Sequence, residues 1–324
     1  MVLKLSTDIV IVGAGTSGCV AATRLVNAGF QVILIDAGPD FGHSDQNNWP
    51  GEITSEKFIG EDTSFDWGYT AQLGLKEKRY LRGKVFGGSS AINASGINWG
   101  LKNDYDRWDE YGLEGWSFNE LLPYFQKVEK LYDFENADNE RGTNGQIKVT
   151  RQIPDQEYFK DFEKSCESYG LRYIDASGPK SAEGYGYVTR NVIDGIRQNP
   201  AQSYLDEIRS KKNFTILDMS EVLKINWDGS FTTGLEIIRN GELININSKH
   251  IILCAGTVGS PILLQRSGIG PRDILEKLGF EANNSKVING VGENLQDHFG
   301  IRYSFAASSY ALKNIEWDKG GSIR

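Results

Sequence analysis

The chain has 324 residues, enough for one large domain or two modest domains that each bury a hydrophobic core. Its formal net charge is -8 and no basic stripe runs along it, so nucleic acid is not an expected partner. The apolar share of 39% is ordinary for a soluble globular protein, and no apolar run is long enough to span a membrane. Because the N-terminus leads directly into a predicted strand, with no room for a signal peptide, we expect a cytoplasmic protein.

Three cysteines lie far apart, at positions 19, 166 and 254. An odd number with this dispersion suits a reducing compartment. None has the spacing of metal ligands, and we therefore expect no metal site. Cys19 and Cys254 lie within apolar runs, which predicts that both are small core residues.

Residues 8–36 have the pattern of a strand, a glycine-rich turn, a helix and a second strand. Apolar and β-branched residues at 8–12 and 31–35 predict two buried parallel strands, and residues 19–28 predict the helix between them. This pattern predicts an α/β fold of the Rossmann type that binds a dinucleotide. A glycine-rich turn in some other α/β domain is the alternative.

The turn of this segment carries three glycines, each with its own expected task. Gly13 permits the tight turn, Gly15 lets a pyrophosphate approach the backbone, and Gly18 lets the helix pack closely on the strand. The N-terminus of the helix favours the phosphate charge. Asp36, after the second strand, is positioned to accept hydrogen bonds from an adenosine ribose, which argues against a 2′-phosphate there. The turn alone leaves FAD and NAD both open.

The middle of the chain is less regular. Residues 41–78 predict a long ordered excursion, because they are polar but contain aromatic side chains. Residues 104–111, 117–131 and 155–169 predict helices, and residues 184–188 look like a strand.

Alternating apolar residues and turn pairs predict a β-meander in the last third of the chain. Asp228-Gly229 and Asn240-Gly241 are pairs favoured in the two-residue turns of hairpins. The predicted strands are residues 222–227, 231–239, 242–246 and, after the meander, the buried strand 251–253.

A second glycine-rich segment, residues 82–96, is rich in small side chains and hydroxyl groups. Such a segment can lay backbone N–H groups against a flat or anionic ligand. The alternative is a flexible linker, but Val85, Phe86 and Ile92 within the segment argue against it.

Two of these segments resemble the signatures of one family. Residues 83–93 look like the first signature of the glucose-methanol-choline (GMC) flavoprotein oxidoreductases, which include choline dehydrogenase and alcohol oxidase. Residues 256–270 resemble the second signature, and the resemblance runs from residue 8 to about residue 302. Shorter matches are residues 104–108, 115–117 and 291–298.

The resemblance implies a Rossmann-like FAD-binding domain with a β-meander, plus an incomplete α+β substrate domain. The implied division is a FAD-binding part at 1–145, a substrate-domain part at 146–214, a second FAD-binding part at 215–300, and the start of a truncated substrate domain at 301–324.

The resemblance also implies FAD as the cofactor. Asp36 would hold the adenosine ribose, where the family usually has Glu, and Val222 would offer its backbone to the adenine. Relatives with covalent flavin carry His at the position of Ile92, so the FAD is expected to be non-covalent. The resemblance implies Gly13, Gly15 and Gly18 at the pyrophosphate, and Val85, Asn93, Ala94, Ser95 and Gly96 along the flavin and pyrophosphate. Thr16, Ser17 and Gly88 complete the implied cofactor-binding residues, with Asp36 at the ribose and Val222 at the adenine.

The implied activity is oxidation of the CH–OH group of a small alcohol. Hydride would pass from the alcohol carbon to flavin N5, giving an aldehyde or ketone, and the electrons would pass to oxygen or a quinone. No catalytic residue is assigned, because the histidine that the family uses is expected beyond Arg324. His298 is expected to anchor a loop, since no partner base can be named near it.

Several alternatives remain open. The chain could be a truncated reading frame, one half of a split enzyme with a separately encoded C-terminal half, or a non-catalytic flavin-binding remnant. The glycine turn by itself also permits an NAD-linked dehydrogenase.

Overall fold

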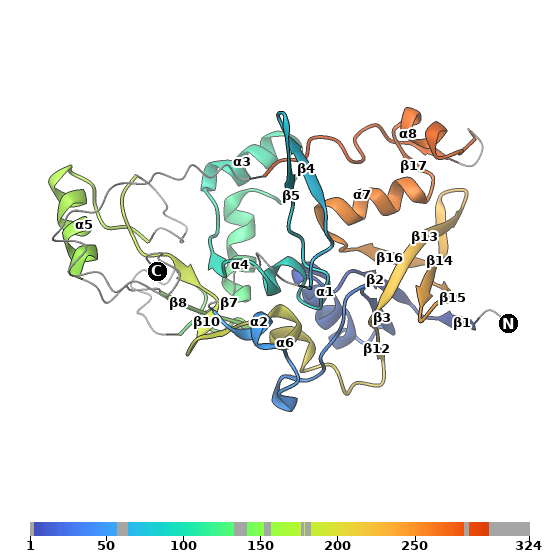
Figure 1. The fold of residues 1–324 in the computed structure, drawn as a ribbon, viewed down its shortest axis with the longest axis horizontal. Coiled ribbons are helices and arrows are strands. Elements are labelled where there is room, and N and C mark those ends of the chain that lie inside the picture. The colour runs from blue at the N-terminus through green and yellow to red at the C-terminus, as the bar shows by residue number, and fades with distance from the viewer. Residues whose placement is uncertain are drawn as a thin grey trace. The chain divides into compact units, whose positions relative to one another are not determined.

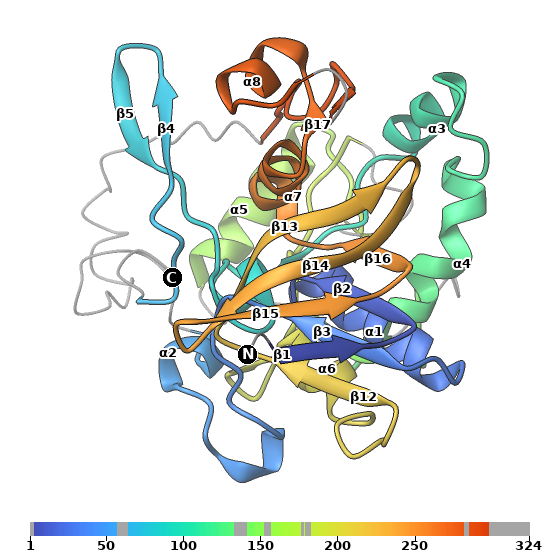
Figure 2. The same cartoon turned by 90° about the vertical axis from the view of Figure 1, so that its right-hand side faces the viewer.

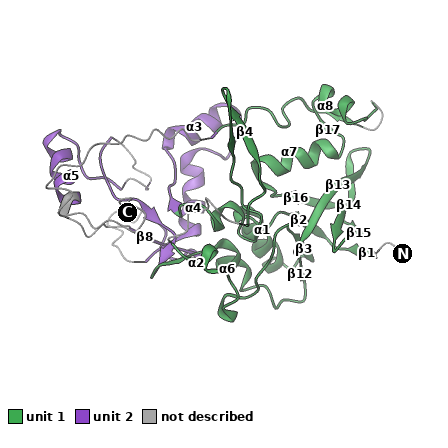
Figure 3. Cartoon of the chain, viewed as in Figure 1, with its two compact units in different colours: residues 1–95, 194–296 green, residues 96–193, 297–324 purple. Residues whose placement is uncertain are grey.

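The structure is a computed structural model, and its described residues are 3–56, 64–132, 141–151, 157–175, 178, 183–281 and 285–297. His298 and the predicted segment 301–324 lie outside them. The chain divides into two compact units, each built from two stretches of sequence (Figure 3). Unit 1 comprises Met1–Ser95 and Asp194–Gln296, and unit 2 comprises Gly96–Ile193 and Asp297–Arg324. The boundaries between the units, after Ser95 and after Ile193, differ from the expected domain boundaries after 145 and 214. The roles of the two domains stay predictions.

A four-stranded parallel sheet forms the centre of unit 1 (Figures 1 and 2). Its order is β12 (Phe214–Leu217), β3 (Val32–Ile35), β2 (Ile9–Val12) and β16 (His250–Leu253). Every residue of β2 and β3 is buried, as expected for parallel strands covered on both faces. Helix α1 (Thr16–Asn27) connects β2 to β3 and begins three residues earlier than expected. The Rossmann-type pattern is therefore confirmed as a fold.

The β-meander is also present in unit 1. The strands β13 (Ser220–Asp228), β14 (Phe231–Arg239) and β15 (Glu242–Asn247) are antiparallel neighbours, and β1 (Leu3–Ser6) adds to β15 in parallel. The meander and the parallel sheet share one hydrophobic core, in which apolar side chains of both sheets are buried. Its members are Val10, Val12, Ile33, Ile35, Leu217, Ile225, Leu235, Ile237, Ile244, Ile246 and Leu263.

The two hairpin turns of the meander differ. Asn240 and Gly241 both have positive φ, 53° and 78°, as a type I′ turn requires. The other turn begins one residue later than predicted, because Asp228 still pairs with Phe231. There Gly229, with φ of 57°, takes the first central position of the turn.

The excursion at 41–78 contains a hairpin that the sequence analysis did not predict. Its strands β4 (Thr70–Leu73) and β5 (Lys76–Arg79) are polar and largely exposed, so no apolar alternation marks them. The remaining elements of unit 1 are η1 (Ser44–Gln46), α2 (Gly51–Thr54), η2 (Gly88–Ala91), β11 (Ile196–Arg197), α6 (Pro200–Leu205), α7 (Gly256–Arg266), β17 (Ile269–Gly270), α8 (Arg272–Lys277) and β18 (Lys286–Val287).

The described residues of unit 2 form a third four-stranded sheet, besides the two of unit 1, and three helices. The sheet order is β6 (Gly96–Ile97), β9 (Thr189–Arg190), β8 (Ile147–Arg151) and β7 (Glu129–Leu131). The other elements are α3 (Lys102–Glu110), α4 (Phe118–Val128), α5 (Glu157–Ser168) and β10 (Val192–Ile193). All three predicted helices are confirmed, but the second ends at Val128 and its last expected residues form β7 instead.

The strand predicted at 184–188 is wrong. Only an isolated bridge between Tyr173 and Tyr185 occurs there, and the strand β9 starts at Thr189. The ring of Tyr173 lies 5.8 Å from that of Tyr185 and 6.0 Å from that of Tyr187. These tyrosines therefore form an aromatic cluster rather than the alternating faces of a strand.

No helix in the part of the chain that the structure describes combines the length and the apolar character needed to cross a membrane.

Candidate functional site

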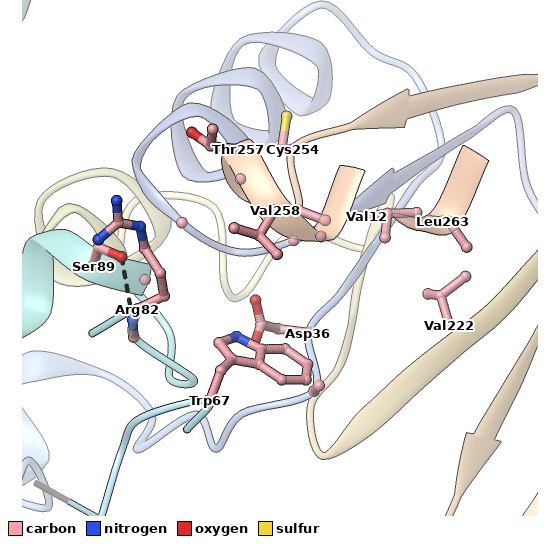
Figure 4. Close-up of a pocket in the computed structure, with 18 of the residues that line it drawn as sticks. Val12, Asp36, Trp67, Arg82, Ser89, Val222, Cys254, Thr257, Val258 and Leu263 are labelled. Atoms are coloured by element: carbon pink, nitrogen blue, oxygen red, sulfur yellow. Dashed lines mark hydrogen bonds between the residues drawn. The ribbon is translucent and has the colours of Figure 1, made fainter. Parts of the chain in front are cut away.

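A cavity of about 500 Å³ lies in unit 1 where β2, β3 and β16 end (Figure 4). The carboxyl edge of a parallel sheet is the usual ligand site of such folds. The turn after β2, Asp36 after β3 and the residues after β16 that begin α7 line the cavity. The start of β13 and the aromatic residues Trp67 and Tyr69 complete its wall.

The three glycines of the first turn are glycines for different reasons. A Cβ on Gly13 would overlap the carbonyl of Cys254, and one on Gly18 would overlap the carbonyl oxygen of Gly13. At Gly15 the nearest atom to such a Cβ is the Cα of Gly88, 3.9 Å away, and φ is an ordinary -72°. The protein's own packing therefore requires Gly13 and Gly18 but leaves space at Gly15, which lines the cavity.

The N-terminus of α1 faces this space without a capping side chain or an acidic residue in its first turn. Its N-cap residue is Gly15, which has no side chain, and its first turn carries no acidic residue. Thr16 and Ser17, the first two helical residues, line the cavity. Backbone N–H groups at such a helix end have no intrahelical partner and attract anions.

The second glycine-rich segment packs directly on the first turn. The backbone N–H of Gly87 donates to the carbonyl of Ala14 at 2.8 Å. The Thr16 hydroxyl donates to the Ser90 hydroxyl at 3.0 Å. A Cβ on Gly88 would come within 2.9 Å of the Cα of Gly15. The two segments that the sequence analysis singled out therefore form one wall of one cavity.

Asp36 ties the end of β3 to the turn after β2. Its Oδ2 accepts from the backbone N–H of Ala14 and its Oδ1 from that of Gly38, both at 2.7 Å. Burial raises the pKa of Asp36 to about 6, although these two amides and the charge of Lys84 act in the opposite direction. Each oxygen has further acceptor capacity that a ribose hydroxyl can use.

Val222 lies on the edge strand of the meander, beside a β-bulge between Val222 and Lys224. A bulge interrupts the regular ladder of backbone hydrogen bonds. Val222 lines the cavity, so its backbone is in the region where an adenine was expected. The predicted site residues that the structure brings together are Gly13, Gly15, Thr16, Ser17, Asp36, Gly88 and Val222.

The other predicted site residues do not line this cavity. Gly18 and Val85 are buried in the fold. Asn93 instead organises its own loop, because its Oδ1 accepts from the Arg197 guanidinium and from the backbone N–H of Ser95, both at 2.9 Å. The remaining members of this group are Ala94, Ser95 and Gly96, of which Gly96 begins unit 2.

The sequence analysis missed several lining residues. Trp67 and Tyr69 come from the irregular excursion, and their only signal was two aromatic residues in a polar stretch. Cys254 was expected in the core, but it is half-buried and lines the cavity, and burial raises the pKa of its thiol. Cys19 is buried as expected and donates to the carbonyl of Ala14 at 3.2 Å.

A family model described as GMC oxidoreductase matches residues 7–300 of the chain. The chain belongs to the GMC oxidoreductase family. An oxygen-dependent choline dehydrogenase of Staphylococcus haemolyticus is 33% identical over 310 residues, which are 92% of this chain and 53% of that GMC relative. The chain thus spans about half the length of the curated relatives that it matches.

Solved GMC structures share the fold. Pyridoxine 4-oxidase from Mesorbium loti superimposes with a TM-score of 0.75 at 28% identity, over 87% of this chain and 55% of that protein. An FAD-dependent oxidoreductase from Chaetomium thermophilum gives 0.76 at 27% identity, over 86% and 50%. The α/β fold expected from the sequence is therefore confirmed, together with an oxidoreductase family of flavoenzymes.

Proposed function

We propose that this chain binds FAD without a covalent link, with the ADP half of FAD in the cavity of unit 1. The protein to which the chain contributes then oxidises the CH–OH group of a small alcohol. The observation that carries this proposal is the meeting of three features in one cavity: a helix N-terminus with no capping side chain, the open space at Gly15, and the Asp36 carboxylate.

The residues present fit the ADP half of a dinucleotide. The amides at the start of α1 suit the pyrophosphate, and the absence of a Cβ at Gly15 lets it approach. Asp36 can accept hydrogen bonds from the ribose hydroxyls and disfavours a 2′-phosphate by charge. Val222, on an edge strand, can offer its backbone to the adenine edge.

FAD, when bound, supplies a hydride acceptor for the alcohol carbon, and oxygen or a quinone is the proposed final acceptor. The role of the residues of this cavity is to bind and orient the cofactor. No histidine is among the residues that line the described cavity, so the proposal assigns no catalytic base to them. The second candidate function is flavin binding without turnover, which needs only the residues of this cavity.

Purified chain incubated with FAD should retain the visible flavin absorption after gel filtration, and NAD should not displace it. Acid precipitation should then leave the yellow colour in the supernatant, since Ile92 offers no nucleophile. Colour in the pellet would contradict non-covalent binding, and displacement by NAD would favour a nicotinamide enzyme.

Turnover with a panel of primary alcohols and choline, using oxygen and an artificial acceptor, separates the two candidates. Rates of about 1–10³ s⁻¹ support an alcohol oxidoreductase. Flavin binding without turnover supports the second candidate. Recovery of turnover on adding a separately expressed C-terminal half would support a split enzyme.

A further inference from the structure

The hairpin of β4 and β5 has no role in the proposed function so far. It projects from unit 1 on a stem that includes Trp67 and Tyr69 (Figure 2). In this stem the Trp67 N–H donates to the carbonyl of Arg82 at 2.9 Å, and the Tyr80 N–H donates to the carbonyl of Tyr69 at 2.7 Å. The stem is therefore held by backbone hydrogen bonds, while the two strands beyond it are largely exposed.

The turn of this hairpin carries an apolar residue where a turn normally has a polar one. Gly74 and Leu75 are the two residues between the strands, and Gly74 has φ of 61°, which suits the first central position of a type II′ turn. The Gln72 side chain donates to the carbonyl of Gly74 at 3.0 Å. Leu75 is 101% exposed, so its side chain presents apolar surface to the solvent without stabilising the fold by packing.

The pairing of the strands gives the hairpin two unlike faces. Residues directly opposite each other on antiparallel strands project to the same side. One face therefore carries only apolar and cationic side chains, in which Leu73 pairs with Lys76 and Ala71 with Lys78. The other face is polar, with Thr70 opposite Arg79 and Gln72 opposite Glu77. Leu73 is the last strand residue before the turn and is 57% exposed, so apolar surface continues from the turn onto the cationic face.

The two lysines of this face are available to an external anion. Both are exposed, and neither forms an ion pair with another residue in the described part of the chain. Arg79, on the other face, is instead paired with Asp66 at 3.0 Å. The formal net charge of the chain is -8, so the cationic face differs in sign from the molecule as a whole. Its charge therefore orients the hairpin towards an anionic partner.

We propose that the β4–β5 hairpin docks on the surface of an anionic lipid bilayer. Its two leucines, Leu73 and Leu75, enter the boundary between headgroups and acyl chains, and Lys76 and Lys78 lie at the headgroups. A small soluble anion would bind the lysines but leave the leucines in water, whereas a lipid surface accommodates both kinds of side chain. One short hairpin gives weak and reversible docking on one side of the bilayer.

Docking would also bring the protein to one class of electron acceptor. Membrane quinones dissolve in the lipid, so a docked protein meets them at a higher local concentration than a dissolved protein does. This consequence rests on the proposed function, in which a quinone is one of the two final acceptors, whereas the docking itself needs no FAD.

Sedimentation with phosphatidylcholine vesicles, prepared with or without phosphatidylglycerol, tests the docking of the full chain in the absence of FAD. The wild-type chain should sediment with the anionic vesicles only, and added salt should weaken this binding. Lys76→Gln combined with Lys78→Gln should weaken it about 25-fold, which is about fivefold for each lysine. Glu77→Gln is the matched control, because Glu77 lies between the two lysines in sequence but on the other face, and it should not weaken binding.

The apolar turn is tested separately. Leu75→Ser should weaken binding to the anionic vesicles about tenfold, because the leucine no longer leaves water. Its thermal unfolding should match that of the wild type, since Leu75 is fully exposed. Leu75→Trp keeps an apolar turn, so it should bind at least as well, with the added indole emission shifted to shorter wavelength. Phe231→Ser is the matched control, because Phe231 is also exposed, at 79%, but lies at the β13–β14 hairpin, and it should leave vesicle binding unchanged.

Absence of binding to the anionic vesicles overturns the proposal, and so does binding that the lysine and leucine variants leave unchanged. Equal binding to vesicles without phosphatidylglycerol overturns it as well, because the lysines would then have no part in it. A dimer in light scattering that Leu75→Ser abolishes, without vesicle binding, would assign the hairpin to a second copy of the chain instead. None of these outcomes affects the proposed function, because the vesicle assay contains no cofactor.

Discussion

The first glycine turn and the second glycine-rich segment use glycine differently. In the first turn, Gly13 and Gly18 occupy positions where a Cβ would overlap backbone, whereas Gly15 has space around it. In the second segment, a Cβ on Gly87 would overlap the side chain of Asn199, and a Cβ on Gly88 would come within 2.9 Å of the Cα of Gly15 in the first turn. The first segment thus lines the cavity with an open position at Gly15, and the second segment packs onto it.

This difference separates two reasons for a glycine that a sequence shows as one letter. A glycine whose missing Cβ is replaced by the protein's own atoms serves folding. A glycine with open space beside it, at a helix N-terminus, is available to a ligand. Substitution by alanine should therefore lower mainly the stability at the first kind of glycine and mainly the ligand affinity at the second kind.

The largest expected effect is on folding. Gly18→Ala should lower the free energy of unfolding by at least about 3 kcal/mol, because the new methyl group overlaps the Gly13 carbonyl inside packed backbone. Denaturant titration measures it. Gly15→Ala is the matched control, three residues away with the same added atom, and should cost less than about 1 kcal/mol in stability while it weakens FAD binding. Equal loss of stability in both variants would remove the distinction between the two glycines.

Asp36 tests the ligand side of the comparison. Asp36→Ala should weaken FAD binding by about 1.5–3 kcal/mol, the usual contribution of hydrogen bonds to a charged group. Asp36→Glu should bind nearly as well, because the longer side chain keeps the carboxylate that accepts from the ribose hydroxyls. Fluorescence titration gives the affinities, with thermal unfolding beside it because Asp36 also accepts from Ala14 and Gly38. Unchanged affinity in a folded Asp36→Ala variant would exclude Asp36 from the site.

The pH dependence of FAD binding tests the charge of Asp36 while the shape of its side chain is kept. With a pKa of about 6, Asp36 is mostly protonated at pH 5 and ionised at pH 7. Ribose hydroxyls donate best to the ionised form, so FAD affinity should rise through about pH 6 and level off above it. Asp36→Asn should flatten that step, and a step of the same size in this variant would assign it to another group.

In the cofactor-free protein, the pH dependence of folding stability that Asp36 causes has the opposite sign to that of FAD affinity. The folded-state pKa of Asp36 is raised above the ordinary value of 3.8, so the folded protein retains a proton that the unfolded chain has lost between about pH 4 and 6. The contribution of Asp36 to stability therefore falls as pH rises through this window.

The smallest expected effect is at the contact between the two segments. Thr16→Val and Ser90→Ala should each cost about 0.5–1.5 kcal/mol in stability, since each removes a hydroxyl hydrogen bond. A double-mutant cycle isolates the bond between them. A coupling energy of zero would show that the two hydroxyls contribute independently.

Local patterns made the βαβ segment and the meander predictable from the sequence. Buried strands such as β2 are continuous apolar runs, and Asn240-Gly241 fits a two-residue turn almost uniquely. The membership in a flavoenzyme family followed from two ordered signatures, and the matching family model confirms it.

What the sequence did not reveal depends on contacts between distant residues. The bond from Gly87 to Ala14 joins positions far apart in the chain, and no periodicity records it. The hairpin of β4 and β5 is solvated on most of its surface, so polarity hid it. Residues 184–188 alternate like a strand, but packing among tyrosines overrides that local preference.

The strand order of the parallel sheet also determines when during synthesis the sheet can be completed. Strand β2 pairs with β16, which starts at His250, while β3 ends at Ile35, so more than 200 residues separate the two sides of the sheet. At roughly 5–20 residues per second, the ribosome needs on the order of 10–40 s to bridge that gap. During this interval the nascent βαβ segment has open strand edges and no α7 beside its glycine turn. The cavity proposed to bind FAD is therefore complete only after β16 and α7 have been synthesised.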